Sequence, residues 1–236
     1  MVAEARRRAE ALLPMQSDLE RAAAGVPRTG FAAALQRADV AVVAEVKRRS
    51  PSKGWINASI SAVDQAEAYA AGGAAAISVL TEPESFGGST EDLVAIRAAV
   101  DVPVLKKDFH VEPIQLIEAA AIGASAALLI VRALSPESLL EMTATANELG
   151  LEVLLEVRDA DELRRALDAA GLHAAVTAIG VNNRDLETLV IDTGRAEALI
   201  KEIPARFAAI AESGVSERGD VERASHGLHT TAPFCR

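Results

Sequence analysis

Charged side chains stand where short apolar runs end, and they are the first sign of chemistry in this chain. The stretch AVVAEVKRRSPSKG carries Glu45 and Lys47, and VLKKDF carries Lys107. Further along, LLEV contains Glu156 and AESG contains Glu212. Ionisable groups are costly to bury unless they neutralise one another. Two lysines and three glutamates that converge from four strand ends would do so around a pocket, so we expect a site there.

Smaller polar and aromatic side chains fall at similar positions. Asn182 follows the apolar run IGV, and Ser213 and Gly214 follow the run AAIAE. Backbone N–H groups of such a loop, with a helix behind them, bind phosphate well. Phe86 and Phe109, two of five Phe, come just past strand ends, where a ring-shaped apolar substrate would use them. The simpler alternative for either ring is a lid or core contact.

Several neighbouring charged residues have plainer interpretations. Lys106 is expected in solvent at its strand end, and Glu212 has an alternative role as the anchor of a loop. His110 and His173 lack a partner pattern for metal or base work, so we expect both to be structural. A basic cluster in this acidic protein favours a pocket opening, or mouth, that attracts anions. Its members are Lys47, Arg48, Arg49 and Lys53.

The elements that must position these side chains alternate along the chain. Seven apolar runs are predicted strands: Val40–Val46, Ala76–Leu80, Val104–Lys107, Ala126–Val131, Glu152–Glu156, Val176–Val181 and Ala208–Glu212. Predicted helices lie between them: Ser61–Ala71, Thr90–Ala99, Glu112–Ile122, Pro136–Leu149 and Ala160–Ala169. Such alternation implies a parallel sheet. Seven repeats favour a (β/α)8 barrel over an open doubly wound sheet, and no G-x-G-x-x-G follows the first strand.

We expect a single domain, with a helical extension at residues 1–39, seven barrel units at 40–227 and an atypical tail at 228–236. The extension contains two helical patterns, Glu4–Leu13 and Gln16–Ala24. After the seventh strand, Ser216–His226 has helical character, but LHTTAPFCR shows no strand of adequate length, because Pro233 would interrupt one. The eighth βα unit is therefore expected to be missing or altered. Its loss would leave the first and seventh strands with unpaired edges.

Composition narrows the class of protein. The 236 residues include 24 basic and 34 acidic side chains, for a net charge of −10, which disfavours nucleic-acid binding. The lone Cys235 excludes an internal disulfide and suits a reducing cytosol. The longest near-apolar run, Ala119 to Val131, is too short to span a bilayer, and the N-terminus lacks the apolar core of an export signal. We expect a cytoplasmic protein without membrane partners.

At this point the sequence resembles the indole-3-glycerol-phosphate synthase family, from Asp39 to about Arg223. The resemblance lies in seven blocks: AEVKRRSPSKG (44–54), ISVLTEPESFGGS (77–89), PVLKKDF (103–109), ALLIV (127–131), LLEV (154–157), IGVNNRDLETL (179–189) and IAESGVS (210–216). The first block, with Glu, Lys and Ser-Pro-Ser at fixed offsets, is distinctive. The N-terminal extension also fits this family.

The resemblance implies conversion of 1-(2-carboxyphenylamino)-1-deoxyribulose 5-phosphate to indole-3-glycerol phosphate, with release of carbon dioxide and water and no cofactor. By resemblance, Lys107 would be the general acid at the ketone oxygen. Lys47 would pair with the substrate carboxylate and act as a second general acid in the dehydration step. Glu156 would accept the proton that completes aromatisation. Glu45 and Asn182 would hold the sugar hydroxyls and the lysines.

Binding roles follow from the same resemblance. The residues that would line the pocket are Ser50, Phe86, Phe109, Arg184 and Glu212, with Ser213 and Gly214 on the phosphate. A polar partner sets the pKa of an acid such as Lys107, and Asp108 or Glu45 could serve. The sequence does not decide which lysine makes which proton transfer. The family is expected to be monomeric, whereas open barrel edges would favour self-association.

Four alternatives stay open at this stage. A Schiff-base aldolase would use Lys107 as its nucleophile. A phosphoribosylanthranilate isomerase would need a different acid–base pair. A metal-dependent lyase would use Glu45, Glu156 and Glu212, although the interleaved lysines would repel a cation. The last alternative is a catalytically impaired, truncated barrel that acts as an oligomerising remnant.

Overall fold

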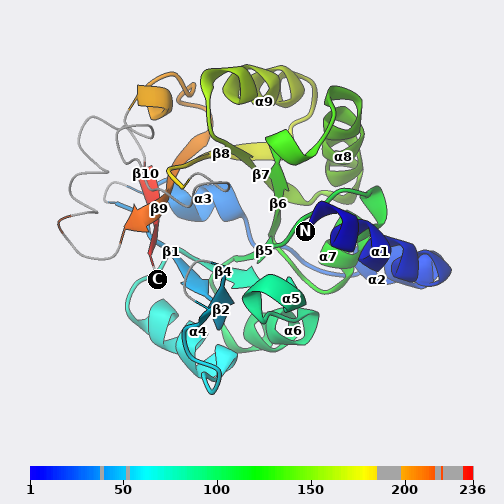
Figure 1. Ribbon diagram of the computed structural model, residues 1–236, viewed down its shortest axis with the longest axis vertical. Helices are drawn as coiled ribbons and strands as arrows, with labels where there is room; N and C mark the ends of the chain where they lie inside the picture. The colour runs from blue at the N-terminus through cyan, green and yellow to red at the C-terminus, as the bar shows by residue number, and fades with distance from the viewer. Residues whose placement is uncertain (38–39, 52–53, 185–197, 216–218, 220–230, 236) are drawn as a thin grey trace.

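The computed structural model describes residues 1–37, 40–51, 54–184, 198–215, 219 and 231–235. The chain begins with α1 (Val2–Leu12), the 3₁₀ turn η1 (Leu13–Met15) and α2 (Gln16–Ala24), close to the two helices predicted for the extension. Ala9 of α1 packs with Ile114 and Ile117 of α7 (Pro113–Ala121), so the extension lies against the outside of the barrel (Figure 1).

Eight parallel strands form a closed barrel, which confirms the predicted fold class. In spatial order they are β1 (Val43–Val46), β4 (Ala76–Leu80), β5 (Val104–Lys107), β6 (Ala126–Ile130), β7 (Glu152–Val157), β8 (Val176–Asn182), β9 (Ala208–Val215) and β10 (Thr231–Cys235). The short strands β2 (Arg49–Ser50) and β3 (Gly54–Trp55) form a separate antiparallel pair after β1.

The expectation of a missing eighth strand is wrong. Strand β10 pairs with β1 on one side and with β9 on the other, so neither edge is open. Pro233 was expected to interrupt a strand, yet it pairs with Ala211, and the register shifts between Pro233 and Cys235. Proline removes one donor without preventing extended backbone, because its fixed φ is compatible with a strand. The predicted helix Ser216–His226 lies, apart from Gly219, outside the described residues.

Helices cover the outer face of the barrel (Figure 1). They are α4 (Ala62–Ala71), α5 (Pro83–Phe86), α6 (Thr90–Ala99), α7, α8 (Pro136–Leu149) and α9 (Ala160–Leu172), with the 3₁₀ turn η2 (Val131–Ala133) after β6. The side chains of Ser135 and Asp159 cap α8 and α9 by accepting backbone N–H groups of the first turn. Within the described part of the chain, none of the helices has the length and apolarity needed to cross a bilayer.

Apolar residues form two layers, one inside the barrel and one between the strands and the outer helices, and the inner layer explains how the strands position the site. The inner layer includes Val43, Leu105, Leu154 and Ile210, each fully buried inside the barrel. The helix α3 (Phe31–Leu35) joins this layer through Phe31. Since side chains alternate across a strand, the residue two positions after each of these points inward as well, at the carboxyl end of the barrel. Those residues are Glu45, Lys107, Glu156 and Glu212.

Candidate active site

The carboxyl ends of β1, β5, β7 and β9 bring one ammonium group and three carboxyl groups together. Lys107 Nζ lies 2.8 Å from Glu212 Oε2 and 3.5 Å from Glu45 Oε2. Glu156 acts on the same lysine through its charge. This end of a (β/α)8 barrel is where such enzymes bind their substrates. The predicted convergence of Glu45, Lys107, Glu156 and Glu212 is therefore present in the structure.

Lys107 is held as an ammonium ion. Burial alone would lower its pKa, but the carboxylates of Glu212, Glu45 and Glu156 outweigh burial and raise the pKa above its usual value. The side chain of Lys107 keeps 16% of its surface exposed, so a substrate in the mouth can reach it. A charged, accessible ammonium group is a proton donor, and it is a poor nucleophile in that state.

Lys47 belongs to the same group of charges. It forms an ion pair with Glu45, and the two side chains are 8% and 9% exposed. Glu45 thereby lies between Lys47 and Lys107. Two cations on one side of the mouth can hold an anionic group, and the shared carboxylate fixes their separation.

Glu156 has a carboxyl group with a raised pKa in this site. Burial raises the pKa of its carboxyl to about 8, the neighbouring Glu212 adds to that rise, and Lys107 opposes it. Asn182 at the end of β8 hydrogen bonds to Glu156 and favours its charged form. The nearby Glu212 carboxylate therefore disfavours the charged form of Glu156.

Asn182 also organises the loop after β9. Its Oδ1 accepts from Ser213 Oγ at 3.0 Å and from the Arg184 backbone N–H at 2.9 Å. Ser213 and Gly214 have positive φ values of 66° and 83°. Left-handed backbone is unfavourable for serine, so the bond to Asn182 helps to hold the loop in this shape. The loop turns beside the charged group, as expected for one wall of an anion site.

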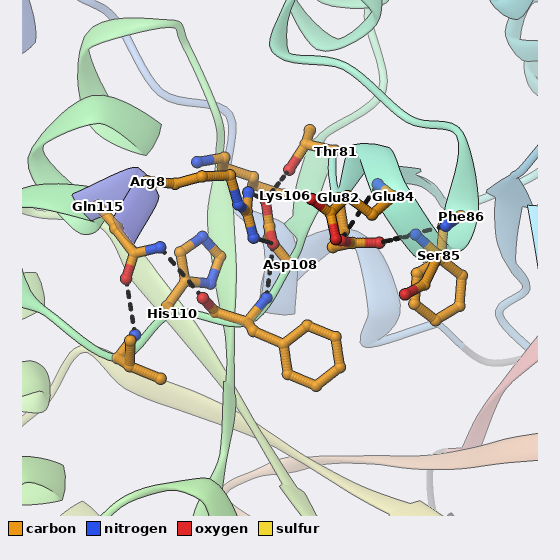
Figure 2. A network of polar contacts seen from close by, with 12 residues as sticks. Arg8, Thr81, Glu82, Glu84, Ser85, Phe86, Lys106, Asp108, His110 and Gln115 are labelled. Atoms are coloured by element: carbon orange, nitrogen blue, oxygen red, sulfur yellow. Dashed lines mark hydrogen bonds and ion pairs between the residues drawn. The ribbon is translucent and has the colours of Figure 1, made fainter. Parts of the chain in front are cut away.

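The predicted ring and loop residues lie at the same end of the barrel, on segments that follow strands. Phe86 ends α5 and is half-buried, Phe109 follows β5 and packs against both apolar layers, and Ser50 is buried in β2. Glu82 accepts the backbone N–H of Phe86 at 3.2 Å and fixes this turn (Figure 2).

Some sequence predictions about neighbouring charges are wrong. Lys106 is only 1% exposed rather than in solvent, because it points outward under α7 and pairs there with Glu118. Asp108 is not the partner of Lys107, since it faces Arg8 of α1 with oxygen–nitrogen distances of 2.8 and 2.7 Å. The sequence gives no signal for this contact, because its partners are 100 residues apart.

The basic cluster after β1 is dispersed over several partners. Arg48 Nη2 donates to Asp92 Oδ1 at 2.9 Å, and Arg49 donates to the Glu84 carbonyl at 2.7 Å. Only Lys47 of the described members joins the charges at the mouth, and Lys53 lies outside the described residues. The two predicted structural histidines have local partners: His110 Nδ1 lies 2.7 Å from the Leu128 carbonyl, and His173 Nδ1 lies 2.9 Å from Thr143 Oγ1.

Comparison with known proteins identifies the family of this chain. The family model described as indole-3-glycerol phosphate synthase matches residues 1–230. Indole-3-glycerol phosphate synthase 1 of Streptomyces coelicolor is 50% identical over 196 residues, which is 83% of this chain and 71% of the relative. The chain belongs to the indole-3-glycerol phosphate synthase family. Members of this family are carboxy-lyases of tryptophan biosynthesis.

A second family member gives the same result with a shorter alignment. The indole-3-glycerol phosphate synthase of Kineococcus radiotolerans is 51% identical over 182 residues, which is 77% of this chain but 65% of that relative's length. The chain thus spans about two thirds of the relatives' own lengths.

Solved structures support the barrel fold alone. Phosphoribosylanthranilate isomerase from Thermotoga maritima superposes with a TM-score of 0.56 and 14% identity, covering 84% of this chain and 87% of that one. A 3-keto-L-gulonate-6-phosphate decarboxylase from Vibrio cholerae gives 0.60 and 12%, with coverage of 84% and 87%.

Proposed function

We propose that this chain catalyses the family's reaction, the ring closure of 1-(2-carboxyphenylamino)-1-deoxyribulose 5-phosphate to indole-3-glycerol phosphate, carbon dioxide and water. The observation that carries the proposal is the Lys107 ammonium group, held between Glu212 and Glu45 at the barrel mouth. The substrate is then a phosphorylated small molecule, and the cytoplasm is the expected compartment.

In this proposal Lys107 donates a proton to the ketone oxygen as the ring carbon attacks the carbonyl carbon. The position of Lys107 supports the role, because Glu212 and Glu45 hold its charged ammonium group at the barrel mouth before the substrate binds. Lys47 would pair with the substrate carboxylate, which leaves as carbon dioxide once the new carbon–carbon bond has formed. Protonation of the resulting hydroxyl releases water, and loss of a ring proton completes the indole.

Glu156 is proposed as the acceptor of that last proton. To accept it, the carboxyl must first be ionised, so the fraction of active enzyme depends on the pKa of about 8. Asn182 would position Glu156 and the loop of Ser213 and Gly214, whose backbone N–H groups are proposed to bind part of the phosphate. Ser50, Phe86, Phe109 and Arg184 are proposed to line the rest of the pocket.

The aldolase alternative fits this site less well. A Schiff-base lysine must lose its proton to attack a carbonyl, and the three carboxyl groups around Lys107 favour the protonated form. The remnant alternative was based on open barrel edges, and β10 pairs with both of them. Among the described residues there is also no group of three or more His, Cys, Asp or Glu side chains suited to a metal ion.

The test is formation of the indole ring, followed by its fluorescence, with the unmodified chain and with Lys107→Met. We expect turnover by the unmodified chain and a loss of about 10²-fold or more in kcat for the variant, as for removal of a general acid. Lys201→Ala, at an exposed lysine remote from the mouth, serves as the matched control. An inactive but folded unmodified chain would refute the proposal. Borohydride trapping of substrate on Lys107 would favour the aldolase.

A further inference from the structure

A polar network outside the barrel connects the N-terminal extension to the strand end that carries Lys107. Arg8 reaches from α1 to Asp108, the residue directly after Lys107 (Figure 2). Both of its terminal nitrogens donate to the carboxylate, Nη1 to Oδ2 at 2.8 Å and Nη2 to Oδ1 at 2.7 Å. A two-pronged arginine–carboxylate pair fixes orientation as well as distance.

Asp108 is the centre of this network. It is 4% exposed, and besides Arg8 it accepts from Thr81 Oγ1 at 2.7 Å and from the Phe109 backbone N–H at 2.7 Å. Although burial alone would raise its pKa, the bonds from Arg8 and the charge of Lys106 lower it to about 2. A fully charged carboxylate with this many donors has little freedom to move.

Thr81, just past the end of β4, links this network to the backbone of Lys107. Its N–H donates to the Lys107 carbonyl at 3.1 Å, while its hydroxyl donates to Asp108. Successive side chains of an extended strand point to opposite faces, so Lys107 faces the mouth while Asp108 faces outward to α1. The backbone of Lys107 and Asp108 is therefore fixed by contacts on the outer side of the barrel.

We infer that Arg8 is a positioning residue for Lys107: through Asp108 and Thr81 it fixes the end of β5, so that the ammonium group points at the reacting atoms. The inference rests on the proposed function. It assigns to the N-terminal extension a part in the proton transfer itself, beyond covering the barrel. Small misplacements of a reacting group are costly, and about 1 Å can cost about 10²-fold in rate.

The surroundings of Arg8 allow chemical rescue. A cavity of about 290 Å³ lies beside it, lined by Arg8, Thr81, Gln115 and Glu118 among others. Guanidinium ion is small enough to enter a cavity of this size and can donate two parallel hydrogen bonds to Asp108, as Arg8 does. The substitution Arg8→Ala would enlarge the space for it.

The experiment compares Arg8→Ala and Arg8→Lys with Arg7→Ala, which removes an exposed arginine paired with Glu4 on the same helix. We expect kcat to fall about 10- to 100-fold for Arg8→Ala, with KM within about threefold, and millimolar guanidinium to restore part of the loss. Arg8→Lys keeps the positive charge but loses the planar guanidinium that makes two parallel hydrogen bonds, so it should give an intermediate kcat. Arg7→Ala should match the unmodified chain.

Two results separate this inference from others. If Arg8 only docks α1, Arg8→Ala will lower the unfolding temperature while kcat per folded molecule stays unchanged, which overturns the inference. If the unmodified chain has no synthase activity, the proposed function is wrong. The position of Lys107 must then be followed by a measurement that does not depend on turnover. For that purpose, the ¹⁵N resonance of Lys107 Nζ should shift or broaden in Arg8→Ala but not in Arg7→Ala; an unchanged resonance overturns the inference.

Discussion

Gly180 lies directly beneath Glu212 in the barrel interior. A Cβ at this position would come within 2.2 Å of Glu212 Oε1 and 3.3 Å of Leu154 Cδ1. The Glu212 carboxylate would have to shift, and this would displace the Oε2 atom that lies 2.8 Å from Lys107. We therefore expect Gly180→Ala to lower kcat by about tenfold or more, because the general acid loses a partner that fixes its position and charge.

The control for this substitution is Gly171→Ala. Gly171 lies in α9, and an added Cβ meets no atom within 4 Å. Alanine favours helix over glycine by about 1 kcal/mol, so this variant should be as active as the unmodified chain and slightly more stable. Equal kcat values for both variants would show that Glu212 does not hold Lys107 as the structure has it.

Glu156 gives a prediction about pH. A proton acceptor must be ionised, and the pKa of Glu156 in the free protein is about 8. We therefore expect kcat/KM to rise with pH up to about 8 and then level off, since this ratio reports groups of the free enzyme. Glu156→Gln should lose about 10²-fold or more in rate and lack this rise. A ratio that falls above pH 8 would instead make Glu156 a proton donor.

Single residues also show where sequence reasoning succeeds. Their position at the ends of apolar runs correctly placed Lys107 and Glu156 at the mouth, and the structure shows that both follow inner apolar residues by two positions. Lys106 was expected in solvent at its strand end, because the sequence could not reveal that α7 covers it. Arg8 was missed because its contact depends on how the extension docks, which no local pattern encodes.

At the scale of elements, Glu152 joins α3 to the amino end of β7. Its carboxylate accepts the backbone N–H groups of Phe31 at 2.7 Å and Ala32 at 3.0 Å, and the hydroxyl of Thr177 at 2.6 Å. It therefore supplies the cap that the first turn of α3 needs. Removal would leave these donors without an acceptor.

We expect Glu152→Ala to lower the free energy of unfolding by about 2–3 kcal/mol, the usual range for a charged acceptor of several hydrogen bonds. Urea unfolding measures this change. Activity of the folded fraction should stay the same, because this end of the barrel is opposite the mouth. Glu148→Ala, at an exposed position on α8, should change the free energy by no more than about 0.5 kcal/mol. Equal midpoints for the two variants would contradict the capping role.

Most elements could be predicted because their patterns are local. Thr90–Ala99, Pro136–Leu149 and Ala76–Leu80 have the predicted bounds, since the apolar pattern of each segment, and the cap just before each helix, are local in sequence. Strand β10 could not be predicted in this way. Its five residues include a proline, and its pairing depends on β1 and β9, which are distant in sequence.

For the whole molecule, closure of the barrel by β10 has the largest consequence. Without β10, the edges of β1 and β9 would each present a row of unpaired N–H and C=O groups, which favour pairing with another chain. Only two residue pairs join β10 to β1, against four between β1 and β4, so the pairing of β1 with β10 is the shorter of the two pairings of β1.

A chain that ends at residue 230 tests this closure. Compared with a chain that ends at Cys235 and so keeps all of β10, we expect a lower unfolding temperature and a mass in sedimentation that rises with concentration. For a chain of this length, each 1 kcal/mol lost lowers the unfolding temperature by about 2–4 °C. Synthase activity should fall as well, since β9 carries Glu212 and Ser213 and would lose one of its two neighbours. If both chains have the same mass and unfolding temperature, β10 does not close the barrel in solution, and the seven remaining strands suffice for the fold.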